Sequence, residues 1–275
     1  MAVSLSTSKE VDKKMSRIKL LISYEGTDFC GWQKQKEHKH ASELPSIQQT
    51  IEEALAKVFN EPIVLSASGR TDSGVHAAAQ IGHFDTERAI PKDLCWAVRG
   101  LLPPSIVVKA AWIVPNEFHS TLSATHKTYR YWIWNQNRSS ALLHRFSWWV
   151  RRPLDLDYLN ETSKFLLKNQ DFKSFQTTGT VVKTTVREVY GAEWIQKKNG
   201  IVEFRITGSG FLKQMVRNIV GTQVQLYLKE RRPDEMASIL AACDRQKAGP
   251  TAPPQGLFLE KVYYPPELDN RCRRI

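Results

Sequence analysis

The chain has 275 residues, of which 41% are hydrophobic and 10% aromatic, and it carries a net charge of +11 with a pI near 9.5. This composition is that of a globular protein and excludes a disordered or low-complexity chain, and the sequence has no apolar run of the roughly eighteen residues that a membrane span needs. The excess of lysine and arginine favours a polyanionic partner such as nucleic acid, because basic side chains that neutralise phosphates release counterions. A basic surface that only keeps the protein soluble is the alternative.

The N-terminal stretch MAVSLSTSKEVDKKM has no apolar segment typical of a leader, because charged residues interrupt it from Lys9 onward. We expect a disordered tail over residues 1–15 of a cytoplasmic protein. The four cysteines are far apart in the sequence and lack metal-ligand spacing, so we expect free thiols in a reducing compartment and no metal site.

The first 115 residues predict the order β-α-β-β-α-β. The first helix has a clear start, because Ser46 and Gln49 match a capping box and apolar residues recur at helical spacing after them. The expected strands cover 17–24, 63–67, 79–86 and 106–114, and the expected helices 46–60 and 91–102.

The rest of the chain repeats that order loosely. The expected strands cover 128–134, 184–195, 201–207 and 256–264, and the expected helices 155–168, 211–228 and 233–243. Two split β-α-β units with antiparallel sheets make α+β the predicted fold class, with one domain over residues 16–115 and a second over 116–275.

The stretch SASGRTDSGVH, residues 66–76, joins two predicted strands and is almost free of apolar residues. Gly69 and Gly74 permit a sharp turn that would project Arg70 and Asp72 from a rigid connection. On the residues alone, a turn stabilised by its Asp side chain is the favoured interpretation. The stretch is not a phosphate-binding Walker loop, because no Gly-Lys-Ser/Thr follows.

Two further stretches combine basic and aromatic residues. In GSGFLKQMVRNIVG, residues 208–221, a glycine turn is expected to open a helix whose first N-H groups favour an anion, with Lys213 and Arg217 on that helix. Arg217 would lie at the edge of an apolar face and need a carboxylate or phosphate partner, which an ordinary structural acid could equally supply. In ATHKTYRYWIWN, Tyr129 and Tyr131 share one strand face; such aromatics stack on bases or simply fill a core.

Taken together, these stretches resemble the TruA-type tRNA pseudouridine synthases over about residues 19–265. The matching segments occur in the family's order and are YEGTDFCGWQ, SIQQTIEEAL, GRTDSGVHAAAQIGHFDT, FHSTLSATHKTYRYWIWN, DFKSF, GFLKQMVRNIVG and DRQKAGPTAPPQGLFLEKVYYP. The resemblance implies two ferredoxin-like domains whose sheets meet at a basic cleft, a homodimer that grips the tRNA anticodon arm, and no metal or organic cofactor. The implied reaction converts uridine to pseudouridine at tRNA positions 38, 39 and 40.

The resemblance also implies roles for individual residues. The family's catalytic aspartate falls on Asp72, its preceding arginine on Arg70, its active-site tyrosine on Tyr129 and its motif arginine on Arg217. Asp72 would act as the nucleophile, with Arg217 as its ion-pair partner, and Arg70 would help to extrude the target nucleotide. Tyr129 would stack on the uracil or take part in proton transfer at C5.

Lys213 and His76 lie in matching segments, and we expect them to contact the substrate, although spacing gives His76 no catalytic partner. Attack at ribose C1′, attack at base C6 and assistance of glycal formation are all compatible with an aspartate at position 72.

Two departures from the family pattern stand out. Thr121 occupies a position that is usually arginine, which puts one phosphate contact in doubt. The segment KEHKHASELP, residues 36–45, looks like a surface insertion in which we expect a loop and no metal site.

The alternative function is a non-catalytic RNA-binding protein or tRNA chaperone with the same fold. A metal-dependent nuclease is disfavoured, because no second and third acid cluster with Asp72 in the sequence.

Overall fold

The computed structural model describes residues 15–34 and 44–275. The expected tail, apart from Met15, and nearly all of the KEHKHASELP insertion therefore lie outside the described residues. Among the described residues, no helix combines the length and the apolar character that a membrane span requires.

The fold is built on one 11-stranded sheet in the order β11-β4-β1-β3-β10-β5-β9-β8-β7, with β2 paired to β3 and β6 paired to β5. The strands are β1 (Ser16–Tyr24), β2 (Ser66–Ala67), β3 (His76–Thr86), β4 (Ile106–Val114), β5 (His126–Trp134), β6 (Trp148–Trp149), β7 (Lys168–Asp171), β8 (Val186–Gln196), β9 (Ile201–Gly208), β10 (Leu257–Tyr263) and β11 (Arg273–Arg274). The α-helices are α1 (Ile47–Phe59), α2 (Leu94–Arg99), α3 (Leu156–Lys164), α4 (Met215–Leu228), α5 (Glu235–Ala241) and α6 (Pro266–Asp269). The expected mixture of helices with a mostly antiparallel sheet is thus confirmed.

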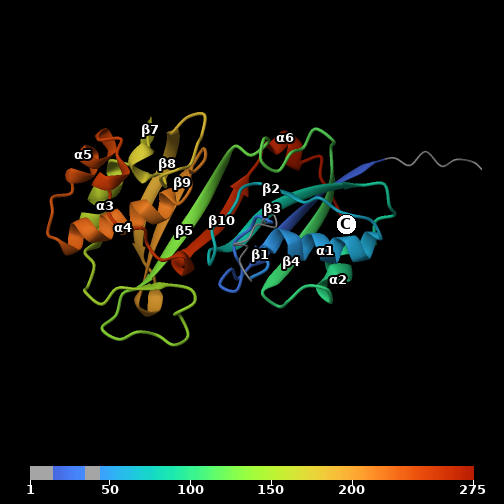
Figure 1. Cartoon of the computed structure of the whole chain (residues 1–275), viewed down its shortest axis with the longest axis horizontal. Coiled ribbons are helices and arrows are strands. Elements are labelled where there is room, and N and C mark those ends of the chain that lie inside the picture. Colours follow the sequence, from blue (N-terminus) through green and yellow to red (C-terminus); the bar gives the residue numbers. More distant parts are fainter. Residues whose placement is uncertain (1–14, 35–43) are drawn as a thin grey trace, which may run out of the picture.

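The strand β10 joins the two halves of the sheet. It pairs in parallel with β3 through Phe258 and His76, and antiparallel with β5 along most of its length. In Figure 1, α1 and α2 lie with β1 to β4 at one end of the molecule, and α3 to α5 lie with β7 to β9 at the other. The C-terminal residues return to the first half, because β11 pairs with β4.

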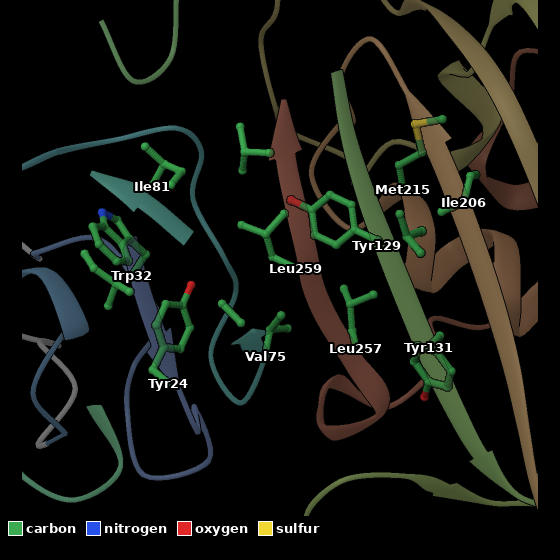
Figure 2. Close-up of a cluster of buried hydrophobic side chains, with 14 of the residues drawn as sticks. Tyr24, Trp32, Val75, Ile81, Tyr129, Tyr131, Ile206, Met215, Leu257 and Leu259 are labelled. Atoms are coloured by element: carbon green, nitrogen blue, oxygen red, sulfur yellow. The ribbon is translucent and has the colours of Figure 1, made fainter. Parts of the chain in front are cut away.

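A buried apolar cluster continues across this junction (Figure 2). It takes Tyr24 from β1 and Val75 from the segment before β3, Leu259 from β10, Tyr129 from β5 and Met215 from α4, all at most 9% exposed. Burial on this scale stabilises the junction through the hydrophobic effect, at about 25 cal/mol per Å² of apolar surface removed from water. The two halves are therefore packed on each other at the place where β10 joins them.

Local sequence signals located most elements well. The strand at 106–114 was predicted with its bounds, and α1 begins after Ser46, whose side chain accepts a hydrogen bond from the Gln49 N-H. The reciprocal half of the capping box is not made, because the Gln49 side chain donates to Glu53 instead.

Several predicted bounds were wrong. The strand at 63–67 is reduced to β2, and the helix expected from residue 91 begins after Asp93, whose side chain caps α2. The helix expected over 155–168 ends at Lys164, because residues 168–171 form β7 against β8. The short strands β6 and β11 and the short helix α6 were not predicted.

His83 on β3 is buried and neutral at physiological pH. Its Nδ1 accepts a hydrogen bond from the Ser120 N-H at 3.2 Å, and burial, the nearby His119 and Arg17 together lower its pKa to about 4. A histidine whose folded-state pKa lies below its unfolded value of about 6.5 binds protons more readily when the chain unfolds. Its contribution to stability is full above pH 6.5 and is lost as the pH falls toward 4.

We therefore expect the free energy of unfolding to fall by up to about 3 kcal/mol between pH 6.5 and 4 because of His83. Urea unfolding at both pH values should show a smaller fall for His83→Asn, whose amide oxygen keeps a hydrogen-bond acceptor near Ser120. An equal fall in the two proteins would contradict this assignment.

Candidate functional site

The Asp72 loop, defined as residues 68–75, connects β2 to β3 and makes a tight turn. The Val75 N-H donates to the Asp72 carbonyl at 3.2 Å, and Gly74 has a φ of +77°. A Cβ at Gly74 would also lie 3.0 Å from Pro254, so the predicted need for glycine is confirmed there. The predicted reason for a glycine at position 69 was wrong, because Gly69 has no positive φ. A Cβ there would instead lie 3.1 Å from the Lys127 Nζ.

The segment between β1 and α1 fixes the other side of this loop. The Trp32 N-H donates to the Thr71 carbonyl at 3.0 Å, and the Ser73 hydroxyl donates to the Phe29 carbonyl at 2.9 Å. Gly31 has a φ of +106°, and a Cβ on it would lie 2.8 Å from the Thr71 carbonyl oxygen. Glycine at position 31 therefore allows the two backbones to approach closely.

Tyr24 and a second glycine complete this contact. The Tyr24 hydroxyl shares a hydrogen bond of 2.8 Å with the Thr71 hydroxyl, and burial raises the pKa of Tyr24 to about 12. A Cβ on Gly26 would lie 2.0 Å from the Val75 carbonyl oxygen. This role of YEGTDFCGW was not predicted, although its two glycines between aromatic residues were a usable signal.

Asp72 is paired with Arg217. The Arg217 Nη1 donates to the Asp72 Oδ2 at 3.2 Å, with the arginine side chain 11% and the aspartate side chain 27% exposed. The Arg217 Nε donates to the Ala252 carbonyl at 2.8 Å, which fixes the direction of the guanidinium. The ion pair therefore joins a loop of the first half to a helix of the second, as the sequence analysis predicted.

The helix that carries Arg217 begins later than predicted. The turn at residues 208–210 does not open it: α4 starts at Met215, after Gln214 in a left-handed conformation with a φ of 60°. Lys213 therefore lies before the helix and not on it, and it is exposed. The glycine turn therefore lacks the helix N-terminus on which the expected anion site depended.

Asp72 opens into a cavity of about 1140 Å³ at the junction of the two halves. Arg70, Tyr129, Lys213 and Arg217 line it together with Asp72, so five of the six predicted site residues lie in one cavity. The lining also includes Lys34, so the described residues contribute four basic side chains and one carboxylate to it. The positive charge of these side chains favours an anionic ligand in the cavity.

Tyr129 is almost fully buried and extends from β5 across β10 (Figure 2). Its ring packs edge-on against Phe211 with centroids 5.0 Å apart. Burial raises its pKa, and the nearby Tyr24 and Asp72 raise it further, so the phenol is protonated at physiological pH. In the described part of the chain no protein group hydrogen-bonds to its hydroxyl, which is thus free to act on a ligand in the cavity.

His76 is not in this cavity. Its Nδ1 accepts from the Gly26 N-H at 3.0 Å, and its Nε2 lies 2.8 Å from the Arg145 carbonyl, so both ring nitrogens are held by backbone groups. The ring lies between Phe146 and Phe258, and burial lowers its pKa. The structure therefore gives His76 the position of a packing residue behind the Asp72 loop.

A family model described as tRNA pseudouridine synthase matches residues 20–121 and 166–265. The chain belongs to the tRNA pseudouridine synthase family. A protein named tRNA pseudouridine synthase A from Bdellovibrio bacteriovorus is 59% identical over 94% of this chain and 99% of its own length. A protein of the same name from Ruminiclostridium cellulolyticum is 40% identical over 91% of this chain and 100% of its own length.

In the synthase, the tight contact at Gly31 generates a testable prediction. We expect Gly31→Ala to lower the free energy of unfolding by about 1–3 kcal/mol, because alanine must adopt a strained φ and its Cβ meets the Thr71 carbonyl. Gly100→Ala is the matched control, since a Cβ there has no neighbour within 4 Å and the backbone is helical. Urea denaturation of both variants tests this, and equal stabilities would contradict it.

Proposed function

We propose that this synthase isomerises uridine to pseudouridine in the anticodon arm of tRNA, at positions 38, 39 and 40, with Asp72 as the nucleophile. The observation that carries this proposal is the Asp72 carboxylate, held by Arg217 at 3.2 Å and open to a basic cavity. The reaction breaks the C1′–N1 bond and forms a C1′–C5 bond, while the C5 hydrogen leaves as a proton and N1 gains one. Substrate and product are isomers, so no oxidant or other co-substrate is needed.

Each site residue has a different role in this reaction. Arg217 keeps the Asp72 carboxylate oriented through its second contact to the Ala252 carbonyl. The target base must leave the stem, which costs on the order of a few kcal/mol, and Arg70 on the exposed rim is placed to fill the gap. Lys213 on the same rim supplies a phosphate contact. The Tyr129 ring stacks on the uracil, and its hydroxyl takes part in removal of the C5 proton.

The strand order supports two ferredoxin-like domains around a central RNA-binding cleft. Within residues 16–115, the neighbours β4-β1-β3-β2 follow the order of one split β-α-β unit. Within residues 116–275, the neighbours β10-β5-β9-β8 repeat it, with α3 and α4 as the crossover helices. The cavity lies where the two units meet.

We propose a cytoplasmic homodimer as the working form. All four cysteines are free thiols, which fits a reducing compartment that also holds the tRNA substrate. The resemblance to the TruA-type synthases supports the homodimer, and sedimentation equilibrium measures it directly.

Replacing the carboxylate tests the enzyme against the alternative of a non-catalytic RNA-binding protein. We expect Asp72→Asn to abolish tritium release from C5-labelled tRNA uridines while tRNA affinity changes little, because the amide keeps the shape but not the nucleophile. Asp157→Asn, an exposed carboxylate on α3, is the matched control and should behave as wild type. Unchanged tritium release in Asp72→Asn would contradict the assignment of Asp72 as the nucleophile. A wild-type protein that binds tRNA without releasing tritium would favour the non-catalytic RNA-binding protein.

The two roles of Tyr129 are separable by mutation. We expect Tyr129→Phe to bind tRNA normally and to lose on the order of 10²-fold in turnover, since it keeps the ring but loses the hydroxyl. Tyr129→Leu should in addition bind more weakly, because the stacking surface is gone. Single-turnover rates and filter-binding affinities measure these effects, and wild-type turnover in Tyr129→Phe would restrict the residue to stacking.

A further inference from the structure

The segment leading to Asp72 is held by an unusual set of side chains. Four consecutive backbone carbonyls, those of residues 66–69, each accept a hydrogen bond from a different side chain. The donors, in the order of the carbonyls, are the Ser120 Oγ at 2.7 Å, the Thr121 Oγ1 at 2.6 Å, the Lys127 Nζ at 2.8 Å and the Gln80 Nε2 at 2.9 Å. We call this set the 66–69 carbonyl contacts.

At Ser68 and Gly69, these side-chain contacts take the place of hydrogen bonds from backbone N-H groups. The pairing of β2 with β3 ends at Ala67, so the carbonyls of Ser68 and Gly69 belong to the loop. Ser68 is fully buried, and a buried carbonyl without a partner costs about 1–3 kcal/mol. Side chains from the loop after β4, from β5 and from β3 supply the partners, so the path of the chain into Arg70 and Asp72 depends on residues far away in the sequence.

Lys127 is the donor that connects this loop to the rest of the site. It lies on β5 two residues before Tyr129, and alternate residues of a strand project to the same face. The ammonium group thus ties the loop that carries Asp72 to the strand that carries Tyr129.

The surroundings of the Lys127 ammonium favour this structural role, in which it holds the Ser68 carbonyl. In the described part of the chain no carboxylate forms an ion pair with it, and burial lowers its pKa. It is not among the residues that line the cavity. At Gly69 a Cβ would lie 3.1 Å from the Nζ, so the absence of a side chain there lets the amine reach the carbonyl of Ser68.

We propose that Lys127 is a positioning residue that, with Gln80, Ser120 and Thr121, fixes the Asp72 loop relative to Tyr129 through the 66–69 carbonyl contacts. This inference rests on the proposed function. It also gives a role to Thr121, which replaces an arginine of the family pattern: its hydroxyl holds the Ala67 carbonyl.

The test uses the whole protein and separates geometry from charge. We expect Lys127→Met to lower the single-turnover rate constant by about tenfold to a hundredfold, the loss that a small misplacement of a reacting group produces, with tRNA affinity unchanged. Lys109→Met is the matched control, because Lys109 also reaches a backbone carbonyl, that of Ala78 at 3.4 Å, but outside the loop. Lys127→Arg keeps a donor and should recover part of the rate.

Hydrogen exchange gives a second readout that needs no activity. Amides of residues 66–75 should exchange faster in Lys127→Met than in wild type, while those of α1 stay unchanged. If Lys127→Met does not fold, Thr121→Val removes another of the 66–69 carbonyl contacts from an exposed position and should show the same two effects, smaller in size.

The proposal is overturned if Lys127→Met reacts as fast as Lys109→Met, if Lys127→Arg is as slow as Lys127→Met, or if exchange over residues 66–75 is as slow as in wild type. A wild-type protein with no pseudouridine formation would instead refute the proposed function, and the exchange measurement would still decide the role of Lys127.

Discussion

The ion pair between Asp72 and Arg217 is the interaction on which the site depends, because its two partners come from different halves of the chain. Neither half contains the pair alone. On the arginine side, the Ala252 carbonyl accepts a hydrogen bond from the guanidinium. Gly221 on α4 lets the segment before Ala252 approach the helix, because a Cβ there would lie only 1.9 Å from the Pro250 carbonyl oxygen. A half-buried pair held in this way is specific in direction, which a solvated ion pair is not.

The two tyrosines near the pair carry no charge at physiological pH. Burial raises the pKa of both Tyr24 and Tyr129, so neither phenol adds a negative charge beside Asp72. Among the described residues that line the cavity, Asp72 is the one carboxylate. Four basic side chains, those of Lys34, Arg70, Lys213 and Arg217, line the cavity around the group proposed to react with a polyanionic substrate.

Local patterns in the sequence predicted most helices and strands, whereas contacts between distant residues were missed, apart from the pair of Asp72 and Arg217 that the family resemblance implied. Residues 106–114 read as a strand because β-branched side chains and flanking turns specify it within the segment. The late start of α4 depends on Gln214 in a left-handed conformation, which no neighbouring residue signals. His76 belongs to the same motif as Asp72, yet β3 begins there and sends its ring behind the loop, against Phe258. The partners of Lys127 and Gly31 are set by tertiary contacts, so periodicity and spacing could not reveal them.

The basic residues of the site fall into two groups according to what they touch. Arg217 and Lys127 each donate hydrogen bonds to protein acceptors, which fixes the position of the groups they contact. Arg70 and Lys213 are exposed on the cavity rim, and within the described residues their side chains make no hydrogen bond or ion pair, so their charge is available to phosphates. The proposed function therefore assigns affinity for RNA and alignment of the reacting groups to different side chains. A substitution on the rim should act mainly on binding and its salt dependence, and one at Lys127 mainly on the rate of the bound complex.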